Sequence, residues 1–237
     1  MTADPDYPLL FVAAYPREAE PWVSRWENPR ALKLPVHWAR AGKWRGRDVI
    51  AVANGVGTKR AIAAVESTQT REHNVVGVCC IGTGGALDPA LAIADVVVAT
   101  AVTNGRTSWP ALDPKGLAAR SGIVYSSRHI ARTSEKKRNL HQSGAIIVEM
   151  ESAGVAGIAQ ELRLPFYCIR AVSDLADETF FTDFESFLTS DGRFSEIRLA
   201  THALAHPIRG LGELLRLQRR TSLAAERLAE YLDTCNF

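Results

Sequence analysis

Short runs of apolar residues recur along the first three quarters of the chain, and helical patterns separate most of them. Runs that are apolar on both faces predict strands that helices cover on each side, in a parallel or mixed sheet. The sequence therefore predicts an α/β fold, a three-layer sandwich whose mixed central sheet is flanked by helices. The runs are LLFVAAY (9–15), VVGVCCIG (75–82), ADVVVATAV (94–102), GAIIVEM (144–150) and PFYCIRAVSD (165–174).

Other stretches add a hairpin and helices. The segment VHWARAGKWRGRDVIAVANG predicts two paired strands with a turn near Gly42–Gly46. Residues 59–72 carry apolar side chains at helical spacing. The basic run 132–138 is typical of a solvated helix start, with Thr133 or Ser134 as its cap.

The character of the sequence changes after Leu188. A polar stretch is followed by helical patterns that continue to the C-terminus and are interrupted at Pro207. With 237 residues, the chain is long for one domain and short for two. We expect a single domain over 1–237, with a core from about 8 to 190 and a C-terminal helical extension from about 195 to 235.

Composition and charge are those of an ordinary globular protein. Hydrophobic residues make up 46% of the chain, and a net charge of +2 gives no electrostatic reason to expect nucleic acid as a partner. The four cysteines show no CxxC spacing, which favours reduced core thiols over disulfides or a zinc site. The N-terminus lacks the features of a signal peptide and no apolar run approaches the ~20 residues of a membrane span, so we expect a cytoplasmic protein.

Carboxylates follow several of the predicted strands at the points where they end. Glu18 follows the first strand. The stretch VEMES supplies Glu149 and Glu151, and RAVSD ends in Asp174. The glycine turn Gly82–Gly85 ends a further strand. Because ligands bind at the carboxyl ends of strands in such sheets, we expect these groups to line one crevice.

Carboxylates that face each other in a partly apolar pocket suit the cleavage of a glycosidic bond. That reaction passes through an oxocarbenium-like state and needs an acid for the leaving group and a base or charge on the sugar side. A carboxyl group buried away from water tends to stay protonated near neutral pH, so Asp174 is the candidate acid. Glu151 offers two acceptor oxygens to two sugar hydroxyls, and Met150 offers a soft apolar contact to the sugar face.

Each of these residues also has a purely structural interpretation. An aspartate at a strand end often caps a helix, which would explain Asp174. Glu18 and Glu151 could complement the dipole of a first helical turn, which is all that we expect of Glu149. Glycines such as Gly82–Gly85 follow strands in many folds.

Four motifs, in this order, resemble the purine nucleoside phosphorylase and nucleosidase superfamily. The resemblance covers residues from about 9 to 190, and the pairing of VEMES with SDLAD is its most specific part. It is closest to the methylthioadenosine/adenosylhomocysteine nucleosidases and to the hopanoid-associated nucleoside phosphorylases. The motifs are NGVGTKRA (54–61), IGTGGALDPALAIADVVVAT (81–100), VEMESAGVA (148–156) and RAVSDLAD (170–177).

The resemblance implies a catalytic role for two of the matching residues. Asp174 matches the aspartate that protonates the purine at N7, with Ser173 orienting it. Glu18 matches the glutamate that activates water in the nucleosidases. Glu151 and Met150 match the pair that holds the ribose.

Further positions match substrate contacts of the superfamily. In the context of these motifs, we expect Thr83, Gly84 and Gly85 to form a backbone cradle for the sugar, the nucleophile or phosphate. His129 falls near the aromatic that stacks on the base, although it is more typical of a pocket or surface residue than of a catalyst. Phe184 matches an aromatic that lies over the substrate.

One departure bears on the nucleophile. Phosphorylases of the superfamily have a phosphate-binding arginine just before the glycine turn, where this chain has Cys80. The nucleosidases also lack that arginine, so the resemblance favours water. Arg17 or Arg60 could still serve phosphate, which leaves phosphate open as a co-substrate. The segment after Thr100 is shorter than in the methylthioadenosine nucleosidases, so their dimer and 5′-pocket details are not carried over.

The C-terminal part resembles the hopanoid-associated branch, whose members remove adenine from an adenosyl-hopane precursor. From Pro207 to Arg220, four arginines and one glutamate are interleaved with leucines and an isoleucine. Such a segment can rest on a membrane surface or shield a lipid-like substituent. Its structural alternative is a helix packed on the core with a solvated basic face.

The sequence thus predicts an enzyme that releases adenine from a nucleoside with a large apolar 5′ substituent. The alternatives are a methylthioadenosine/adenosylhomocysteine nucleosidase, a purine nucleoside phosphorylase, or a nucleoside-binding module without activity. No metal or organic cofactor is expected, since the leaving purine needs only a proton and the carbocation only electrostatic cover. The resemblance also implies a homodimer or larger homo-oligomer.

Overall fold

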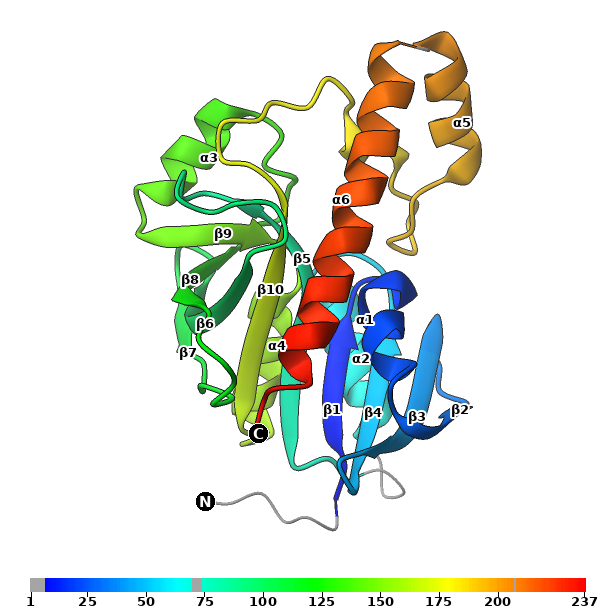
Figure 1. Ribbon diagram of the computed structural model, residues 1–237, viewed down its shortest axis with the longest axis vertical. Helices are drawn as coiled ribbons and strands as arrows, with labels where there is room; N and C mark the ends of the chain where they lie inside the picture. The colour runs from blue at the N-terminus through cyan, green and yellow to red at the C-terminus, as the bar shows by residue number, and fades with distance from the viewer. Residues whose placement is uncertain (1–6, 70–73, 207) are drawn as a thin grey trace.

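A computed structural model describes residues 7–69, 74–206 and 208–237 of the protein (Figure 1). All five predicted apolar runs form strands, which confirms the α/β class. The strands are β1 (Leu9–Ala13), β2 (Glu27–Ala31), β3 (Trp38–Trp44), β4 (Arg47–Ala53), β5 (Gly77–Ala86), β6 (Val96–Thr103), β7 (Ser108–Pro110), β8 (Arg120–Ser126), β9 (Ala145–Glu149) and β10 (Phe166–Asp174). The helices are α1 (Pro16–Val23), α2 (Thr58–Thr68), α3 (Ser134–His141), α4 (Ser152–Glu161), α5 (Glu196–Ala205) and α6 (Arg209–Leu232), with a 3-10 turn η1 (Phe184–Phe187).

The strands form one mixed sheet that partly closes on itself. The strand order is β10-β6-β8-β9-β5-β1-β4-β3-β2, with β7 paired to β6. An additional pairing of β5 with β10 joins β5, β9, β8, β6 and β10 into a ring. Strand β1 pairs in parallel with both β4 and β5, and β5 pairs in parallel with β10. The carboxyl ends of β1, β5 and β10 therefore lie at the same edge of the sheet.

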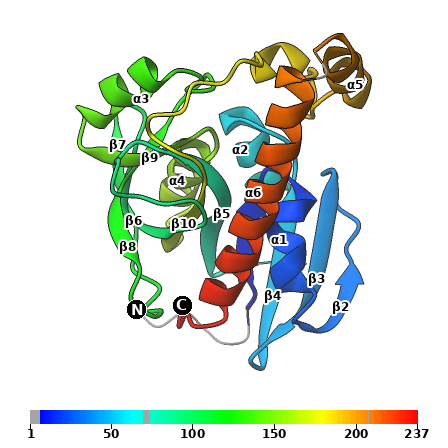
Figure 2. The same ribbon diagram turned by 45° about the horizontal axis from the view of Figure 1, so that its top comes forward.

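Both faces of the sheet are buried, as the apolar runs predict. Leu10 and Val12 of β1 pack in one cluster with residues of α2 and α4. Leu9 and Phe11 pack in a second cluster with residues of α1 and α6, since successive side chains of a strand point to opposite faces. Figure 2 shows α1 and α6 on the near side of the sheet, with α2 and α4 beyond it. The chain thus forms three layers.

The predicted hairpin and helices are present with small differences. Strands β3 and β4 turn at Arg45 and Gly46, which both have positive φ values (50° and 78°), as a tight hairpin turn requires. Helix α2 ends at Thr68, and the end of the predicted segment at 70–72 lies outside the described residues. Thr133 caps α3 by accepting a hydrogen bond from the Lys136 amide at 3.1 Å.

Two predictions about local structure are wrong. The stretch Gly82–Gly85 is not a turn after the strand, because β5 continues through it to Ala86 and pairs there with β9 and β10. The basic run around α3 is not wholly solvated, because Lys137 is completely buried. Both differences have a tertiary cause, since partners distant in sequence hold these residues in place.

The C-terminal helices combine packing on the core with a projecting end. The second half of α6 is buried through Ala224, Leu228 and Leu232, and it contacts α1 and β10. Helix α5 and the first half of α6 rise above the sheet, beyond the carboxyl ends of its strands (Figure 1). In the described part of the chain, no helix is long and apolar enough to cross a membrane.

Candidate active site

A cavity of about 410 Å³ opens where the strands end. Its volume falls in the range of small-molecule sites, and its floor carries the carboxylates predicted from the sequence. All ten predicted site residues border this cavity, so the crevice expected from the strand ends is present. They are Glu18, Thr83, Gly84, Gly85, His129, Met150, Glu151, Ser173, Asp174 and Phe184.

Glu18 is held with both carboxylate oxygens occupied. It lies in the first turn of α1 and is buried. One oxygen, Oε2, accepts hydrogen bonds from the amides of Ala14 (3.1 Å) and Tyr15 (3.0 Å). The other, Oε1, accepts from the amide and the hydroxyl of Thr83, both at 2.9 Å. Four donors hold this carboxylate in a fixed orientation, as a general base requires.

Glu151 directly follows Met150 and is the N-cap residue of α4. Its Oε1 accepts a hydrogen bond from the Gly57 amide at 2.8 Å, which links the VEMES motif to the start of α2. Burial, and next the nearby carboxylate of Glu149, raise the pKa of Glu151 to about 8. A ligand with two hydroxyl donors would replace the missing solvent and stabilise the charged form of this carboxylate.

Asp174 ends β10 with its two oxygens on different partners. The Ser173 hydroxyl donates to Oδ1 at 2.7 Å, and it also lies 3.1 Å from the Gly84 carbonyl. The Lys137 ammonium donates to Oδ2 at 2.5 Å. The candidate acid Asp174 therefore has a buried cationic partner, Lys137, that the sequence did not predict.

Glu149 does more than begin a helix, contrary to the sequence prediction. Its Oε2 accepts from the amides of Glu151 and Ser152, both at 2.9 Å, which is the predicted helix-start role. In addition it forms a buried ion pair with Arg170 of β10. Arg170 also donates to the Ile81 carbonyl at 2.8 Å. This pair fixes the ends of β5, β9 and β10 relative to one another beneath the cavity.

The Arg170 guanidinium also explains the surroundings of Cys80. Its Nη2 lies 2.9 Å from Cys80 Sγ, inside the core. Burial raises the pKa of the Cys80 thiol, so it stays neutral and serves as packing, as predicted. Arg170 is already engaged by Glu149 and the Ile81 carbonyl, and so it is not free to act as the phosphate-binding arginine that Cys80 replaces.

Two glycines of β5 are required by these close approaches. A Cβ atom on Gly82, whose φ is +146°, would lie 2.6 Å from Arg170 Nη1 and 3.0 Å from Glu18 Oε1. A Cβ atom on Gly85 would lie 2.7 Å from Asp174 Oδ2. The glycines therefore give the carboxylates access to the floor of the cavity.

His129 and Phe184 border the mouth of the cavity in different ways. His129 is exposed, and its Nδ1 lies 2.5 Å from Glu185 Oε1. Phe184 is buried in η1, and its ring packs edge-on against Phe180 and close to Phe194. His129 is thus oriented by a carboxylate at the entrance, while Phe184 belongs to an aromatic wall.

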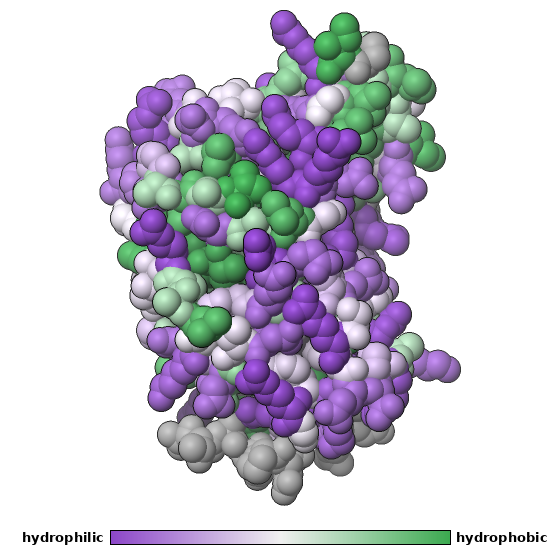
Figure 3. Space-filling model, viewed as in Figure 1, coloured by the Kyte–Doolittle hydropathy of each residue, from purple (hydrophilic) through white to green (hydrophobic). Residues whose placement is uncertain are grey.

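The outer part of the cavity is apolar. Leu199 of α5 and Leu214 and Leu217 of α6 border it together with the aromatic wall. Figure 3 shows hydrophobic surface beside α6 near the middle of the molecule and again over the projecting end of α5 and α6. The cavity therefore has carboxylates on its floor and apolar side chains around its outer part.

The two candidate phosphate ligands are separated by the fold. Arg17 borders the cavity, with its guanidinium 4.9 Å from the centroid of the Tyr15 ring. Arg60 borders a different hollow between α2 and α4 and donates to the Ser190 carbonyl at 2.7 Å.

Among the described residues, no cluster of three or more His, Cys, Asp and Glu side chains could hold a metal ion.

Comparison with known sequences identifies relatives. The chain matches the family described as the phosphorylase superfamily over residues 38–117 and 111–201. A 5′-methylthioadenosine/S-adenosylhomocysteine nucleosidase of Staphylococcus epidermidis is 26% identical over 178 residues, which are 62% of this chain and 77% of the relative. The enzyme of the same name from Pseudoalteromonas translucida is 28% identical over 195 residues, 68% of this chain and 82% of the relative.

Solved structures share the whole fold at low sequence identity. The Neisseria meningitidis nucleosidase of that name, in complex with methylthio-immucillin-A, has a TM-score of 0.74 at 20% identity and covers 96% of this chain and 97% of its own. Futalosine hydrolase of Helicobacter pylori has a TM-score of 0.73 at 16% identity, with 97% of each chain covered. Since the family match spans more than half of its length, the chain belongs to the phosphorylase superfamily of enzymes.

Proposed function

We propose that the protein cleaves the N-ribosidic bond of an adenine nucleoside that carries a large apolar 5′ substituent, and releases adenine. The observation that carries this proposal is the meeting of three carboxylates, Glu18, Glu151 and Asp174, on the floor of one cavity with an apolar outer wall. The reaction needs an acid that protonates the leaving purine, a general base that activates the nucleophile, and a group that holds the ribose.

Each residue has one step in this mechanism. Asp174, oriented by Ser173, delivers a proton to N7 of the purine as the bond to the sugar breaks. Glu151 accepts hydrogen bonds from the ribose hydroxyls, and Met150 contacts the sugar face. Glu18 removes a proton from the water that attacks C1′.

The remaining predicted residues frame the substrate. Thr83, Gly84 and Gly85 line the floor on the side of the sugar, where Thr83 also fixes Glu18. His129, held by Glu185, and Phe184 border the base at the entrance. Together they exclude bulk water and hold the nucleoside in a fixed orientation relative to the catalytic carboxylates.

Water is the favoured nucleophile. The guanidinium nearest the glycine stretch, that of Arg170, is paired with Glu149, and Arg60 faces another hollow. Among the described residues, Arg17 is the one arginine that borders the cavity. Its position there favours a phosphorylase as the alternative. The named nucleosidase relatives support hydrolysis of a methylthioadenosine-like substrate as a second candidate.

The apolar outer wall supports a large 5′ substituent such as the hopane group of an adenosyl-hopane. Leu199, Leu214 and Leu217 come from the two C-terminal helices that rise beside the cavity. A methylthio group would leave most of this wall in water, whereas a lipid-like group would cover it at a gain of about 25 cal/mol per Å².

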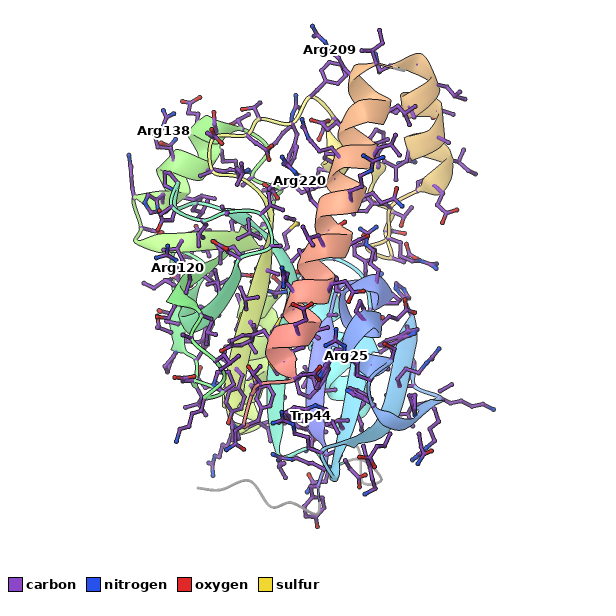
Figure 4. All side chains as sticks on the ribbon, viewed as in Figure 1. Arg25, Trp44, Arg120, Arg138, Arg209 and Arg220 are labelled. Atoms are coloured by element: carbon purple, nitrogen blue, oxygen red, sulfur yellow. The ribbon has the colours of Figure 1, made fainter. Side chains whose placement is uncertain are left out.

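The same helices support contact with an anionic lipid surface. Ile197, Leu204 and Ile208 at the projecting end are 78%, 81% and 89% exposed. Arg198 and Arg209 are exposed beside them, and Arg209 lies at the tip of α6 (Figure 4). Apolar residues flanked by arginines suit the interface of a membrane with anionic headgroups, where an amphiphilic substrate also resides.

Sedimentation with anionic and with zwitterionic vesicles would test this contact. Binding only to anionic vesicles, lost when Ile197, Leu204 and Ile208 are replaced by serine, is the expected result. Leu117→Ser is the control, since Leu117 is 68% exposed in the loop before β8. Equal sedimentation of the triple variant and the protein itself would contradict the proposal.

A homo-oligomer is also part of the proposal. Half-buried Ile62 and Trp109 border the hollow between α2 and α4, and Met150 borders both this hollow and the cavity. A second copy seated there would touch the residue that contacts the ribose. Light scattering after size exclusion measures the assembly, and a monomer at micromolar concentration would exclude it.

The test of the activity is adenine release from adenosine, methylthioadenosine and a 5′-alkyl adenosine, each with and without phosphate. Release without phosphate, fastest with the 5′-alkyl substrate, is expected. Strict dependence on phosphate would make the protein a phosphorylase, and preference for methylthioadenosine would select the second candidate. In Asp174→Asn, turnover should disappear while ligand affinity survives; unchanged behaviour in every assay would favour a binding module without activity.

A further inference from the structure

Lys137 is a fully buried charged residue that contacts Asp174 on the floor of the cavity. It is 0% exposed, although it belongs to a helix whose neighbouring residues are basic. Its Nζ lies 2.5 Å from Asp174 Oδ2 and 2.5 Å from the Leu175 carbonyl oxygen. The ammonium also lies 5.3 Å from the centroid of the Phe180 ring. Three favourable contacts thus hold one cation against the proposed proton donor.

The pairing is specific to these two groups. Another cation nearby, Arg220 of α6, donates to both oxygens of Glu178 at 2.6 and 2.8 Å. Glu178 in turn accepts from the Leu175 amide at 3.0 Å. Figure 4 shows Arg220 reaching from α6 toward the loop that follows β10. Arg220 is therefore neutralised by Glu178, and Lys137 is left to Asp174.

This arrangement determines where the proton is before the reaction. Both oxygens of Asp174 accept hydrogen bonds, one from the Ser173 hydroxyl and one from the Lys137 ammonium. A carboxylate with two donors and a cation in contact is stabilised in its ionised form. The proton that the departing purine requires is then on the lysine nitrogen, not on the carboxyl group.

We propose that Lys137 supplies, through Asp174, the proton that the leaving purine takes up. As the C1′–N9 bond breaks, its electron pair passes to the purine, Asp174 gives a proton to N7, and Lys137 gives its proton to Asp174. Glu18 takes a proton from the water whose oxygen bonds to C1′. Lys137 ends as a neutral amine and Glu18 as an acid, and exchange with solvent restores both.

Direct contact makes this transfer feasible, because the hydrogen bond from Lys137 Nζ to Asp174 Oδ2 is already formed at 2.5 Å. The developing negative charge on the purine raises the demand for a proton only while the bond breaks. Lys137 does not touch the substrate and is therefore a positioning and proton-supplying residue for Asp174.

The inference rests on the proposed function and is tested with two leaving groups. Adenine must be protonated to leave, whereas 4-nitrophenolate leaves without a proton. We expect Lys137→Met to lower kcat for adenine release by ~10²-fold or more, the usual contribution of a general acid, and to change cleavage of 4-nitrophenyl riboside by less than ~3-fold. Equal losses on both substrates, or none on either, would overturn the inference.

Two further variants separate proton supply from charge and folding. Lys137→Arg keeps the cation but cannot give up its proton, so we expect it to lose adenine release as Lys137→Met does. Full activity in Lys137→Arg would show that only the charge matters and would overturn the inference. Arg138→Met, on the exposed side of the same helix (Figure 4), is the control and should leave both rates unchanged.

A measurement without turnover keeps the two proposals apart. The carbon-13 carboxyl signal of Asp174, identified by its loss in Asp174→Asn, reports ionisation in the unliganded protein. An ionised Asp174 at neutral pH supports the inference even if Lys137→Met does not fold, and a protonated Asp174 overturns it. Failure of the protein to release adenine from any nucleoside would instead overturn the proposed function.

Discussion

The Arg170 guanidinium and the Glu149 carboxylate form an ion pair in which each side chain is only 1% exposed. Arg170 lies on β10 and Glu149 on β9, and the Ile81 carbonyl that completes the contact lies on β5. The pair therefore joins three strand ends directly beneath the floor of the cavity.

Removing one member of this pair should destabilise the protein strongly. Arg170→Met would leave the Glu149 charge buried without its partner, and we expect the free energy of unfolding to fall by about 3–5 kcal/mol. Denaturation in urea, followed by far-UV circular dichroism, measures the change. Arg25→Met is the control, because the exposed pair of Arg25 with Asp233 at 2.6 Å should contribute about 1 kcal/mol or less. Equal effects of the two substitutions would contradict a structural role for the buried pair.

Gly85 should be needed for activity more than for folding. In Gly85→Ala the new methyl group would lie 2.7 Å from Asp174 Oδ2, so the carboxylate must move away from the leaving base. We expect kcat for adenine release to fall by at least ~10-fold, since small displacements of a catalytic group cost much rate. Gly212→Ala in α6 meets nothing within 4 Å and should keep full activity while stabilising the helix by roughly 0.5–1 kcal/mol. An active Gly85→Ala would show that Asp174 need not occupy this position.

Glu151→Gln should trade stability against activity in a pH-dependent way. Burial raises the pKa of Glu151 from 4.5 to about 8, so the folded state binds a proton that the unfolded chain has lost between these values. The stability of the protein should therefore fall as pH rises from about 4.5 to about 8, whereas glutamine does not titrate.

The melting temperature measures this prediction directly. Between pH 6 and pH 9 we expect the stability of Glu151→Gln to rise relative to the unsubstituted protein by roughly 1–3 kcal/mol. This is a fraction of the roughly 5 kcal/mol that the whole pKa shift represents at about 1.4 kcal/mol per unit. Its kcat/KM should fall by about 10²-fold, because charge-assisted hydrogen bonds to the ribose are lost. A stability difference that is constant with pH would mean that Glu151 is ionised throughout this range.

The fold and the floor of the site could be predicted because their signals are local. Strand β1 and strand β10 are continuous apolar runs, and the ends of parallel strands meet wherever the sheet forms. Once the runs at 9–15 and 165–174 are assigned as strands, Glu18 and Asp174 are brought to one edge of the sheet without further information.

The missed features depend on contacts between distant residues. Only two of the seven residues of β8 are buried, and β2 is fully exposed, so neither strand has a continuous apolar run that would predict it. Lys137 stands in a basic run that is typical of a solvated helix, and its burial depends on contacts with residues about 40 positions away, among them Asp174. Arg170 is likewise a single charged residue within an apolar run of the sequence. Its role depends on Glu149, which the fold brings next to it.

The apolar wall should determine which 5′ substituents are accepted. Leu217 of α6 is half-buried at the cavity, so Leu217→Asn would place an amide where the proposed lipid-like group would pack. We expect KM for a 5′-octyl adenosine to rise by about 10-fold, the equivalent of 1.4 kcal/mol or most of one buried leucine contact, while methylthioadenosine is scarcely affected. Leu215→Asn is the matched control, because Leu215 is 45% exposed two residues away and does not border the cavity. If Leu217→Asn raised KM equally for both substrates, the wall would contact the nucleoside itself, and the 5′ group would have to lie elsewhere.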